Sequence, residues 1–363
     1  MRNIIGKGCI CQLESLRKEG FKKAELSTVE SCLHIDPKIH RDIEIFSMHE
    51  DKGKFCIEKS IVWGNIGDNS RLGDLSEELL KRQINYAHKH GIKRFVFHPG
   101  NANIFVCERE VALSTVVKRI KRIYDSFVDC KGKQTLNVKL CIENSEFRPD
   151  ITAYHNERLV VDAKHVNSLL KKADEKNIKL HLVVDIEHLY VTSIFKLIYD
   201  DLKNEYESIT SPSTCIKAKR EADKKAEKML LARAKEDDIK KEISRFLSNF
   251  FKELGCYAKR VEAIHVCGSD YHNYKKIKEN TTRTKGSHLP ICYYSDDKRK
   301  CITDKVNHLE YLNLLDEYVD DKVPLVIEVE VPFSETKNYI EYVSESRDRL
   351  NKIQKFTNYN KLN

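Results

Sequence analysis

The sequence contains no long hydrophobic run. No stretch approaches the roughly 20 consecutive apolar residues that a membrane-spanning helix needs. The first six residues, Met1 to Gly6, include one charge and too few apolar residues for a signal peptide. Both absences predict a soluble, cytoplasmic protein with no membrane partner.

The 12 cysteines do not form a recognisable disulfide or metal pattern. No two of them are spaced as Cys-x-x-Cys, and several, such as Cys141 and Cys267, stand in apolar, strand-like runs. Cys9 and Cys11 are too closely spaced and too isolated to indicate a metal site. We expect reduced thiols with a structural role. The net charge of +8 is modest for this length, so it permits nucleic acid or phosphorylated substrates but requires neither.

The chain is long and apolar enough to bury a large core. Its 363 residues are 40% apolar, which suits one barrel with insertions or two smaller domains. Short β-rich runs alternate with amphipathic helical stretches, the pattern of a parallel sheet covered by helices. We therefore expect an α/β fold, a (β/α)8 TIM barrel. Its clear strands are 94–97, 137–142, 180–184, 261–264 and 324–327, its weaker ones 3–6, 22–26 and 60–63, and its helices include 75–90, closed by Gly91, 111–124 and 166–177.

A charged segment interrupts this alternation between the sixth and seventh strands. We expect a helical insertion over 204–255, which divides the barrel into a first part, 1–203, and a last part, 256–363, with a C-terminal helix. Its basic stretch, 217–241, is mixed with acidic residues and is typical of a solvated helix face, although it could also grip a partner or a second copy. An apolar continuation indicates a helix docked on the barrel, through Ile243, Phe246, Leu247, Phe250 and Phe251.

Polar residues follow five successive strands. Each residue alone could be a loop residue or a helix cap, but parallel barrels carry their reactive groups at the C-terminal strand ends. The five together therefore predict a functional rim. In chain order the strands end in His98-Pro99-Gly100, Glu143-Asn144-Ser145, Asp185-Ile186-Glu187-His188, His265 and Glu328-Val329-Glu330.

The chemistry of this rim suits a divalent metal ion. Three carboxylates, of Glu143, Asp185 and Glu328, with the imidazole of His265 make a mixed oxygen and nitrogen ligand shell that fits Mn²⁺, Zn²⁺, Co²⁺ or Mg²⁺. An ion held there can polarise a carbonyl or phosphoryl oxygen while a neighbouring carboxylate moves protons. A second irregular stretch, 270–318, holds Asp270, His272 and Arg283, which are either substrate contacts or ordinary polar loop residues.

The motifs in order resemble a known superfamily. His-Pro-Gly, Ile-Glu-Asn, Asp-x-x-His, His, His-Leu-Pro and Val-Ile-Glu are similar to the xylose-isomerase-like barrels, which include sugar epimerases and isomerases as well as endonuclease IV. The resemblance spans about 1–332 without the insertion. It implies a four-ligand metal site of Glu143, Asp185, His265 and Glu328. It also implies that His188 contacts substrate or a further zinc ion, and that His98 and His288 are additional zinc ligands in the endonuclease branch.

Two departures from the endonuclease pattern stand out. That branch has a histidine at the end of an early strand, where this chain offers Lys59-Ser60-Ile61, and an aspartate two residues before His288, where this chain has Gly286. A glycine-rich turn after His-Leu-Pro is replaced by 291–294. We therefore expect one complete metal site and an altered substrate pocket.

Three functions fit these residues. The leading hypothesis is a metal-dependent isomerase or epimerase of a sugar or sugar phosphate, in which Glu143 and Glu328 exchange a proton and His188 orients the substrate. The rival is an endonuclease IV-like phosphodiester hydrolase of abasic DNA, with extra metal recruited by His98, His188 and His288. The third is a barrel retained as a binding or scaffold subunit, with the charged insertion as its docking arm.

Overall fold

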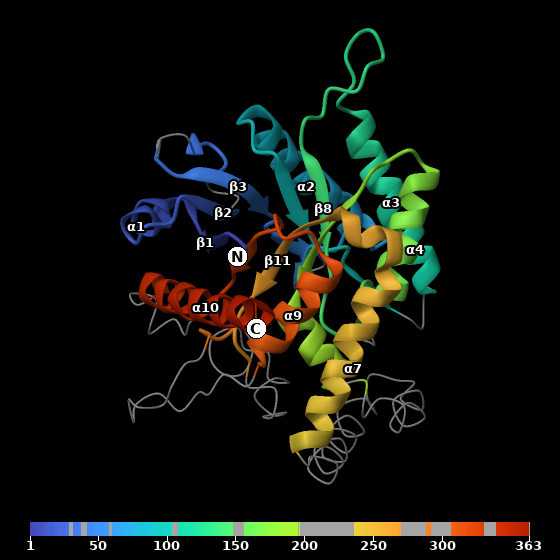
Figure 1. The fold of residues 1–363 in the computed structure, drawn as a ribbon. Helices are drawn as coiled ribbons and strands as arrows, with labels where there is room; N and C mark the ends of the chain where they lie inside the picture. The colour runs from blue at the N-terminus through green and yellow to red at the C-terminus, as the bar shows by residue number, and fades with distance from the viewer. Residues whose placement is uncertain are drawn as a thin grey trace.

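Eight parallel strands close into a barrel. The computed structural model describes residues 1–28, 32–37, 42–57, 60–103, 108–147, 156–194, 196, 236–269, 288–291, 306–329 and 339–362. Figure 1 shows these strands inside a layer of helices. The strands pair around the barrel in the order β1-β12-β11-β10-β8-β6-β3-β2. This confirms the predicted TIM barrel. The bounds are β1 Ile4–Gly8, β2 Lys23–Ser27, β3 Glu44–His49, β6 Arg94–Phe97, β8 Lys139–Glu143, β10 His181–Asp185, β11 Val261–Val266 and β12 Leu325–Ile327.

Helices cover the outside of the barrel. Neighbouring helices contact one another in the series α2, α3, α4, α7, α9 and α10. Local signals fix their ends: the Ser70 hydroxyl accepts from the Leu72 amide at the start of α2, and Gly91 follows α2 with φ +72°. The bounds are α1 Leu13–Lys18, α2 Arg71–Lys89, α3 Arg109–Asp125, α4 Ala163–Glu175, α7 Glu236–Leu254, α9 His308–Tyr318 and α10 Tyr339–Leu362, with short 3-10 helices η1 Ile10–Gln12 and η5 Gly255–Arg260.

The predicted third barrel strand, 60–63, is wrong. Ser60–Trp63 forms β5, which pairs antiparallel with β4, Lys54–Ile57, in a separate two-stranded sheet. The third barrel strand is β3, which pairs with β2 and β6. A four-residue apolar run fits either place, because its pairing partners, and not its own pattern, decide which sheet it joins. A further small sheet pairs β7, Asn101–Asn103, with β9, Asn156–Arg158.

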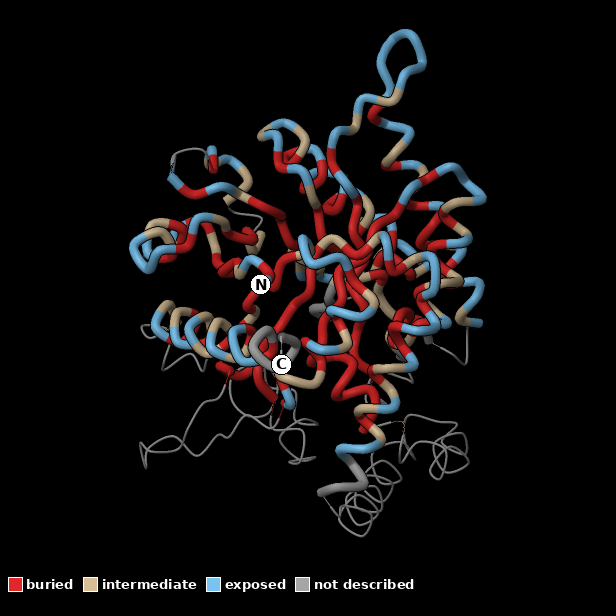
Figure 2. The backbone as a smooth tube through the Cα atoms, viewed as in Figure 1, coloured by how far each residue is buried: buried red, intermediate tan, exposed pale blue. Residues whose placement is uncertain are grey.

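The barrel interior is layered. An apolar layer fills its middle, and the strands that enclose it are buried (Figure 2). Side chains alternate between the two faces of a strand, so the residue two positions after an inward-facing one also faces inward. In six strands that residue is polar, which places a ring of charged and imidazole groups above the apolar layer. The six pairs are Ile5 and Lys7, Val96 and His98, Cys141 and Glu143, Val183 and Asp185, Ala263 and His265, and Val326 and Glu328.

A cluster of paired charged side chains lies at the opposite, N-terminal end of the strands. Glu262 accepts from Arg94 Nε at 2.9 Å and Lys139 Nζ at 2.6 Å, and lies 2.9 Å from His181 Nδ1. Because TIM barrels carry their reactive groups at the other end, this cluster has a structural role.

Helix α7 is the described part of the predicted insertion. Its residues Ile243, Leu247, Phe250 and Phe251 are buried, and the helix contacts α4 and α9. The charged segment before residue 236 lies outside the described residues, as do Asp270, His272, Arg283, Gly286 and Glu330. The insertion and the domain boundaries therefore stay predictions. Within the described ranges, no helix has the length and apolar character to cross a membrane.

Candidate metal centre

The Glu143 carboxylate lies at the centre of the polar ring. Its oxygens are 2.8 Å from His49 Nε2, 3.4 Å from His265 Nδ1, 3.6 Å from His98 Nε2 and 3.7 Å from His188 Nδ1. Burial raises the pKa of this carboxyl, but the positive charge of His265 outweighs burial and holds the pKa well below its usual range. Glu143 is therefore an ionised carboxylate in a nearly closed site.

Three groups of side chains could each hold an ion. Within each group the donor atoms lie within 4.8 Å of one another. In the order given below, Glu143 belongs to the first and second groups, and His188 belongs to the second and third. Each group therefore shares a residue with the next. They are His49, Glu143, His265 and Glu328; His98, Glu143 and His188; and Asp185, His188 and His288.

The predicted four-ligand set is divided between these groups. Glu143, His265 and Glu328 come together as expected, with His265 Nδ1 2.7 Å from Glu328 Oε2. Asp185 instead belongs to the third group, where its Oδ2 lies 3.8 Å from His288 Nε2. In the first group His49 takes the place expected for Asp185. Candidate donor atoms therefore converge in more than one place.

His49 was missed by the sequence analysis, which assigned the early-strand position to Lys59-Ser60-Ile61 and expected no histidine there. That prediction is wrong, because β3 ends in His49. The register between β2 and β3 shifts at Ala24 and Glu25, which leaves an extra residue in β3 and changes which side chains face inward. The available signal was a histidine at the end of a short, mostly apolar run, as His98 follows β6 and His265 stands near the end of β11.

Two buried charged residues that contact the candidate ligands were also missed. Glu25 lies 3.0 Å from His265 Nε2 and accepts from Ser47 Oγ at 2.6 Å, while Lys7 donates to Glu328 at 2.6 Å. Burial raises the pKa of Glu25, but the charges of His265 and Lys7 outweigh it and bring the pKa to about 2. Lys7 lies just beyond the predicted strand 3–6, and Glu25 follows Lys22 and Lys23 in the predicted strand 22–26, so no local pattern marked either residue as buried.

Further contacts orient the imidazoles. Glu50 Oε1 accepts from the His98 amide at 2.7 Å and lies 3.0 Å from His98 Nδ1, and the Asn144 carbonyl is 2.7 Å from His188 Nδ1. Burial, with the charge of Lys52, lowers the pKa of His98 to about 4. His98 is therefore neutral near pH 7, which is the form of histidine that binds metals.

The donor set passes a test of fit for divalent ions. Among the described residues, the buried Asp185 Oδ2 takes part in no hydrogen bond, and the nearest ionic partners, His288 Nε2 and His188 Nδ1, lie 3.8 and 3.9 Å away. A buried polar atom without a partner is costly, and a coordinated ion would satisfy it. Mixed carboxylate and imidazole donors suit Zn²⁺ and Mn²⁺.

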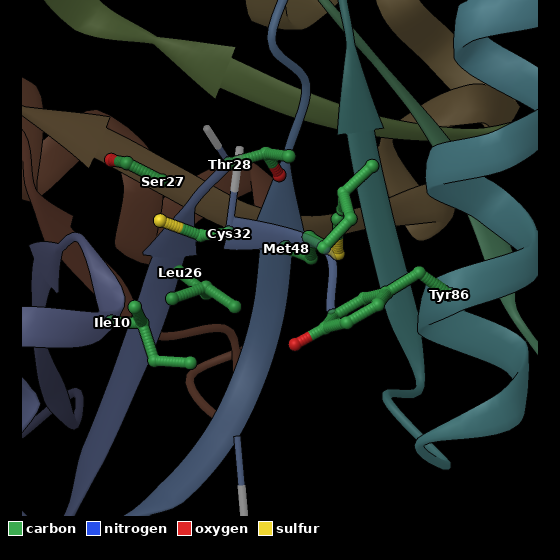
Figure 3. A pocket seen from close by; sticks show the side chains of 8 residues that line it. Ile10, Leu26, Ser27, Thr28, Cys32, Met48 and Tyr86 are labelled. Carbon is green, nitrogen blue, oxygen red and sulfur yellow. The ribbon is translucent and has the colours of Figure 1, made fainter. Parts of the chain in front are cut away.

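A small apolar pocket lies elsewhere, on the outer face of the barrel. Strands β2 and β3, through Leu26 and Met48, and helix α2, through Tyr86, border it (Figure 3). Met48 and Leu26 belong to the core between strands and helices, and not to the layer inside the barrel. No lining residue carries a full charge, so this pocket does not share the chemistry of the ring.

No family model matches the sequence, and no curated protein shows significant similarity to it. Solved structures do match. A D-tagatose 3-epimerase-like protein covers 99% of both chains with a TM-score of 0.59 at 13% identity. An L-ribulose 3-epimerase covers 99% of this chain and 96% of that one, with a TM-score of 0.53 at 10% identity. An AP endonuclease of family 2 from Brucella melitensis covers 94% and 98%, with a TM-score of 0.52 at 9% identity.

The chain has the TIM-barrel fold that these solved structures share. The barrel implied by the motif order is confirmed at this level. At such identities the likeness concerns the fold alone, since one barrel fold can serve unrelated reactions. The reaction has to be argued from the ring itself.

Proposed function

We propose that this protein is a metal-dependent phosphodiester hydrolase that acts on DNA, in the manner of an AP endonuclease. The observation that carries the proposal is the series of three connected ligand groups. A single ion bound by three carboxylates and one imidazole, with His188 orienting the substrate, would leave three further histidines of these groups without a role. These are His49, His98 and His288.

Several ions suit phosphodiester cleavage. When bound, they would polarise a phosphoryl oxygen and lower the pKa of a water molecule. The chain's own part is to hold the ions: Glu143 is shared by the first two groups, and His188 by the second and third.

Positive charge near the ring fits an anionic substrate. Lys52 follows β3, close enough to Arg158 of β9 that the charge of Arg158, after burial, lowers the pKa of Lys52. Two cations held near each other beside a carboxylate-rich centre can bind a phosphate of the DNA backbone. An uncharged sugar would not require this pair.

The isomerase hypothesis stays as the second candidate. The observation in its favour is that two carboxylates, Glu143 and Glu328, contact the same atom, His265 Nδ1, at 3.4 and 2.7 Å. Carboxylates this close to one imidazole could exchange a proton with a substrate carbon. That chemistry needs one ion only.

Metal counting and a cleavage assay separate the candidates. We expect the purified protein to bind two to three ions per chain and to nick duplex DNA that contains one abasic site. Glu143→Gln should abolish nicking, whereas Glu262→Gln, a matched change at the opposite end of the barrel, should preserve it. One ion per chain, no nicking, and exchange of solvent deuterium into ketoses would overturn the proposal in favour of the isomerase. Inactivity in both assays would favour a binding subunit.

A further inference from the structure

Lys7 places a positive charge inside the ring of candidate metal ligands. Its side chain is 8% exposed, and its Nζ lies 2.6 Å from Glu328 Oε1 and 3.5 Å from Glu25 Oε1. A lysine is never a ligand while it is protonated, and a buried cation opposes a second cation nearby. Neither role assigned to the ring so far uses this residue.

The backbone holds Lys7 at this position. It stands between Gly6 and Gly8 of β1, where a Cβ atom would approach Leu16 of α1 to 2.8 and 3.1 Å, so strand and helix are in close contact. The Tyr339 hydroxyl of α10 donates to the Lys7 carbonyl. The ammonium group is therefore directed at Glu328 by a closely packed strand, and not by a flexible loop.

Glu328 is the residue that Lys7 and an ion would share. One of its oxygens pairs with Lys7, and the other lies 2.7 Å from His265 Nδ1. An ion in the first group would need an oxygen of Glu328 together with His49, Glu143 and His265. Two positive charges around one carboxylate repel each other, most strongly where water is excluded.

We propose that Lys7 and a divalent ion are alternative partners of Glu328, so that Lys7 sets the metal affinity of the first group. Without an ion, Lys7 neutralises Glu328 and Glu25 and keeps the Glu328 carboxylate in place. An ion that enters takes Glu328 from Lys7. Lys7 is thus a positioning residue, and the inference rests on the proposed function only in requiring that this group binds a metal.

The test compares Mn²⁺ binding to chelator-treated wild type and Lys7→Met by titration calorimetry. The relevant binding step is the one that His49→Ala removes. We expect Lys7→Met to bind at least tenfold more tightly, and Lys7→Arg, which keeps the charge, to bind no more tightly than wild type. Lys139→Met is the matched control: it breaks another 2.6 Å lysine–glutamate pair at the other end of the barrel and should stay within twofold of wild type.

Lys7→Met leaves two buried carboxylates with less compensation and could fail to fold. In that case the double variant Lys7→Met/Glu25→Gln removes one positive and one negative charge, and the same tighter binding is expected because Glu328 still loses its ammonium partner. Wild-type affinity or weaker binding in the folded variant would overturn the inference alone. If wild type itself bound no Mn²⁺, the metal premise of the proposed function would fail as well.

Discussion

Glu50 orients His98 with one carboxylate oxygen. That oxygen accepts from the His98 amide at 2.7 Å and lies 3.0 Å from its Nδ1, which leaves Nε2 facing Glu143 at 3.6 Å. Such contacts fix which ring nitrogen is free to bind metal, and their loss typically weakens metal binding about 10- to 100-fold. We therefore predict that Glu50→Ala lowers the affinity for the ion of the second group by about this factor, measured by calorimetry.

The control for this variant is Glu44, at the start of β3, the strand that directly precedes Glu50. Glu44 is exposed and pairs with Lys23 on the surface, where ion pairs contribute little. Glu44→Ala should leave metal affinity unchanged. Equal losses in both variants would mean that charge in general, and not the orientation of His98, determines binding.

Glu262 makes stability depend on pH. Burial raises the pKa of its carboxyl, but hydrogen bonds from His181, Lys139 and Arg94 outweigh burial and bring the pKa to about 2, against an ordinary value of 4.5. Because the folded-state pKa is depressed, this contribution is complete above pH 4.5 and is lost as the pH falls towards 2. It amounts to about 3 kcal/mol.

We predict that Glu262→Gln lowers the free energy of unfolding at pH 7 and loses less of it between pH 4.5 and 2.5 than wild type does. Urea unfolding at several pH values measures both effects. Glu44→Gln serves as the control, since an exposed carboxylate should leave the acid dependence nearly unchanged. An acid dependence identical to wild type in Glu262→Gln would refute the assignment.

At the scale of elements, the sequence predicts the strands whose burial is complete on both faces. Runs such as 94–97 and 180–184 are apolar at nearly every position, which is typical of parallel strands under helices. β3 does not show this apolar pattern, because Ser47 and His49 interrupt its apolar residues. An extra residue also shifts its register against β2. Its place in the barrel follows from pairing of Met48 with Phe95, which no local pattern contains.

The candidate ligands show the same difference between what a local sequence pattern predicts and what depends on contacts far along the chain. Ligand-type residues at the ends of strands, such as Glu143 and His265, are predictable because the barrel fold brings those ends together. The grouping of ligands depends on side-chain directions, which separated Asp185 from the other three predicted ligands. The charge partners Lys7 and Glu25 contact residues more than 200 positions away, and no spacing rule reaches that far.

Helix α7 is held to the barrel by its apolar face. Phe250 is 2% exposed, and the helix contacts both α4 and α9. Truncation of a buried phenylalanine removes its packing and leaves a cavity, which costs about 3–5 kcal/mol. We predict a loss of this size in the free energy of unfolding for Phe250→Ala, measured with urea. Phe356→Ala, in α10 and 55% exposed, should cost less than about 1 kcal/mol; similar losses in both variants would contradict the docking of α7.

For the whole molecule, metal binding and folding should be one process. The candidate ligands come from β3, β8, β10 and β11, from positions directly after β6 and β12, and from His188 and His288. These residues span the chain from 49 to 328, so the groups exist only when the barrel is closed. Ions that bind the folded protein and not the unfolded chain add to its stability.

The number of ions can therefore be read from stability. For each ion bound only by the folded protein, the free energy of unfolding rises by about 1.4 kcal/mol per tenfold increase in free metal above the dissociation constant. Three bound ions predict about 4 kcal/mol per tenfold, and one ion about 1.4. His98→Ala removes a candidate ligand of the second group, so it should lower this dependence by about 1.4 kcal/mol per tenfold, the contribution of one ion. Glu44→Ala should not change it. A wild-type dependence of one ion would exclude the three-ion centre and leave the single-ion isomerase as the better account of this barrel.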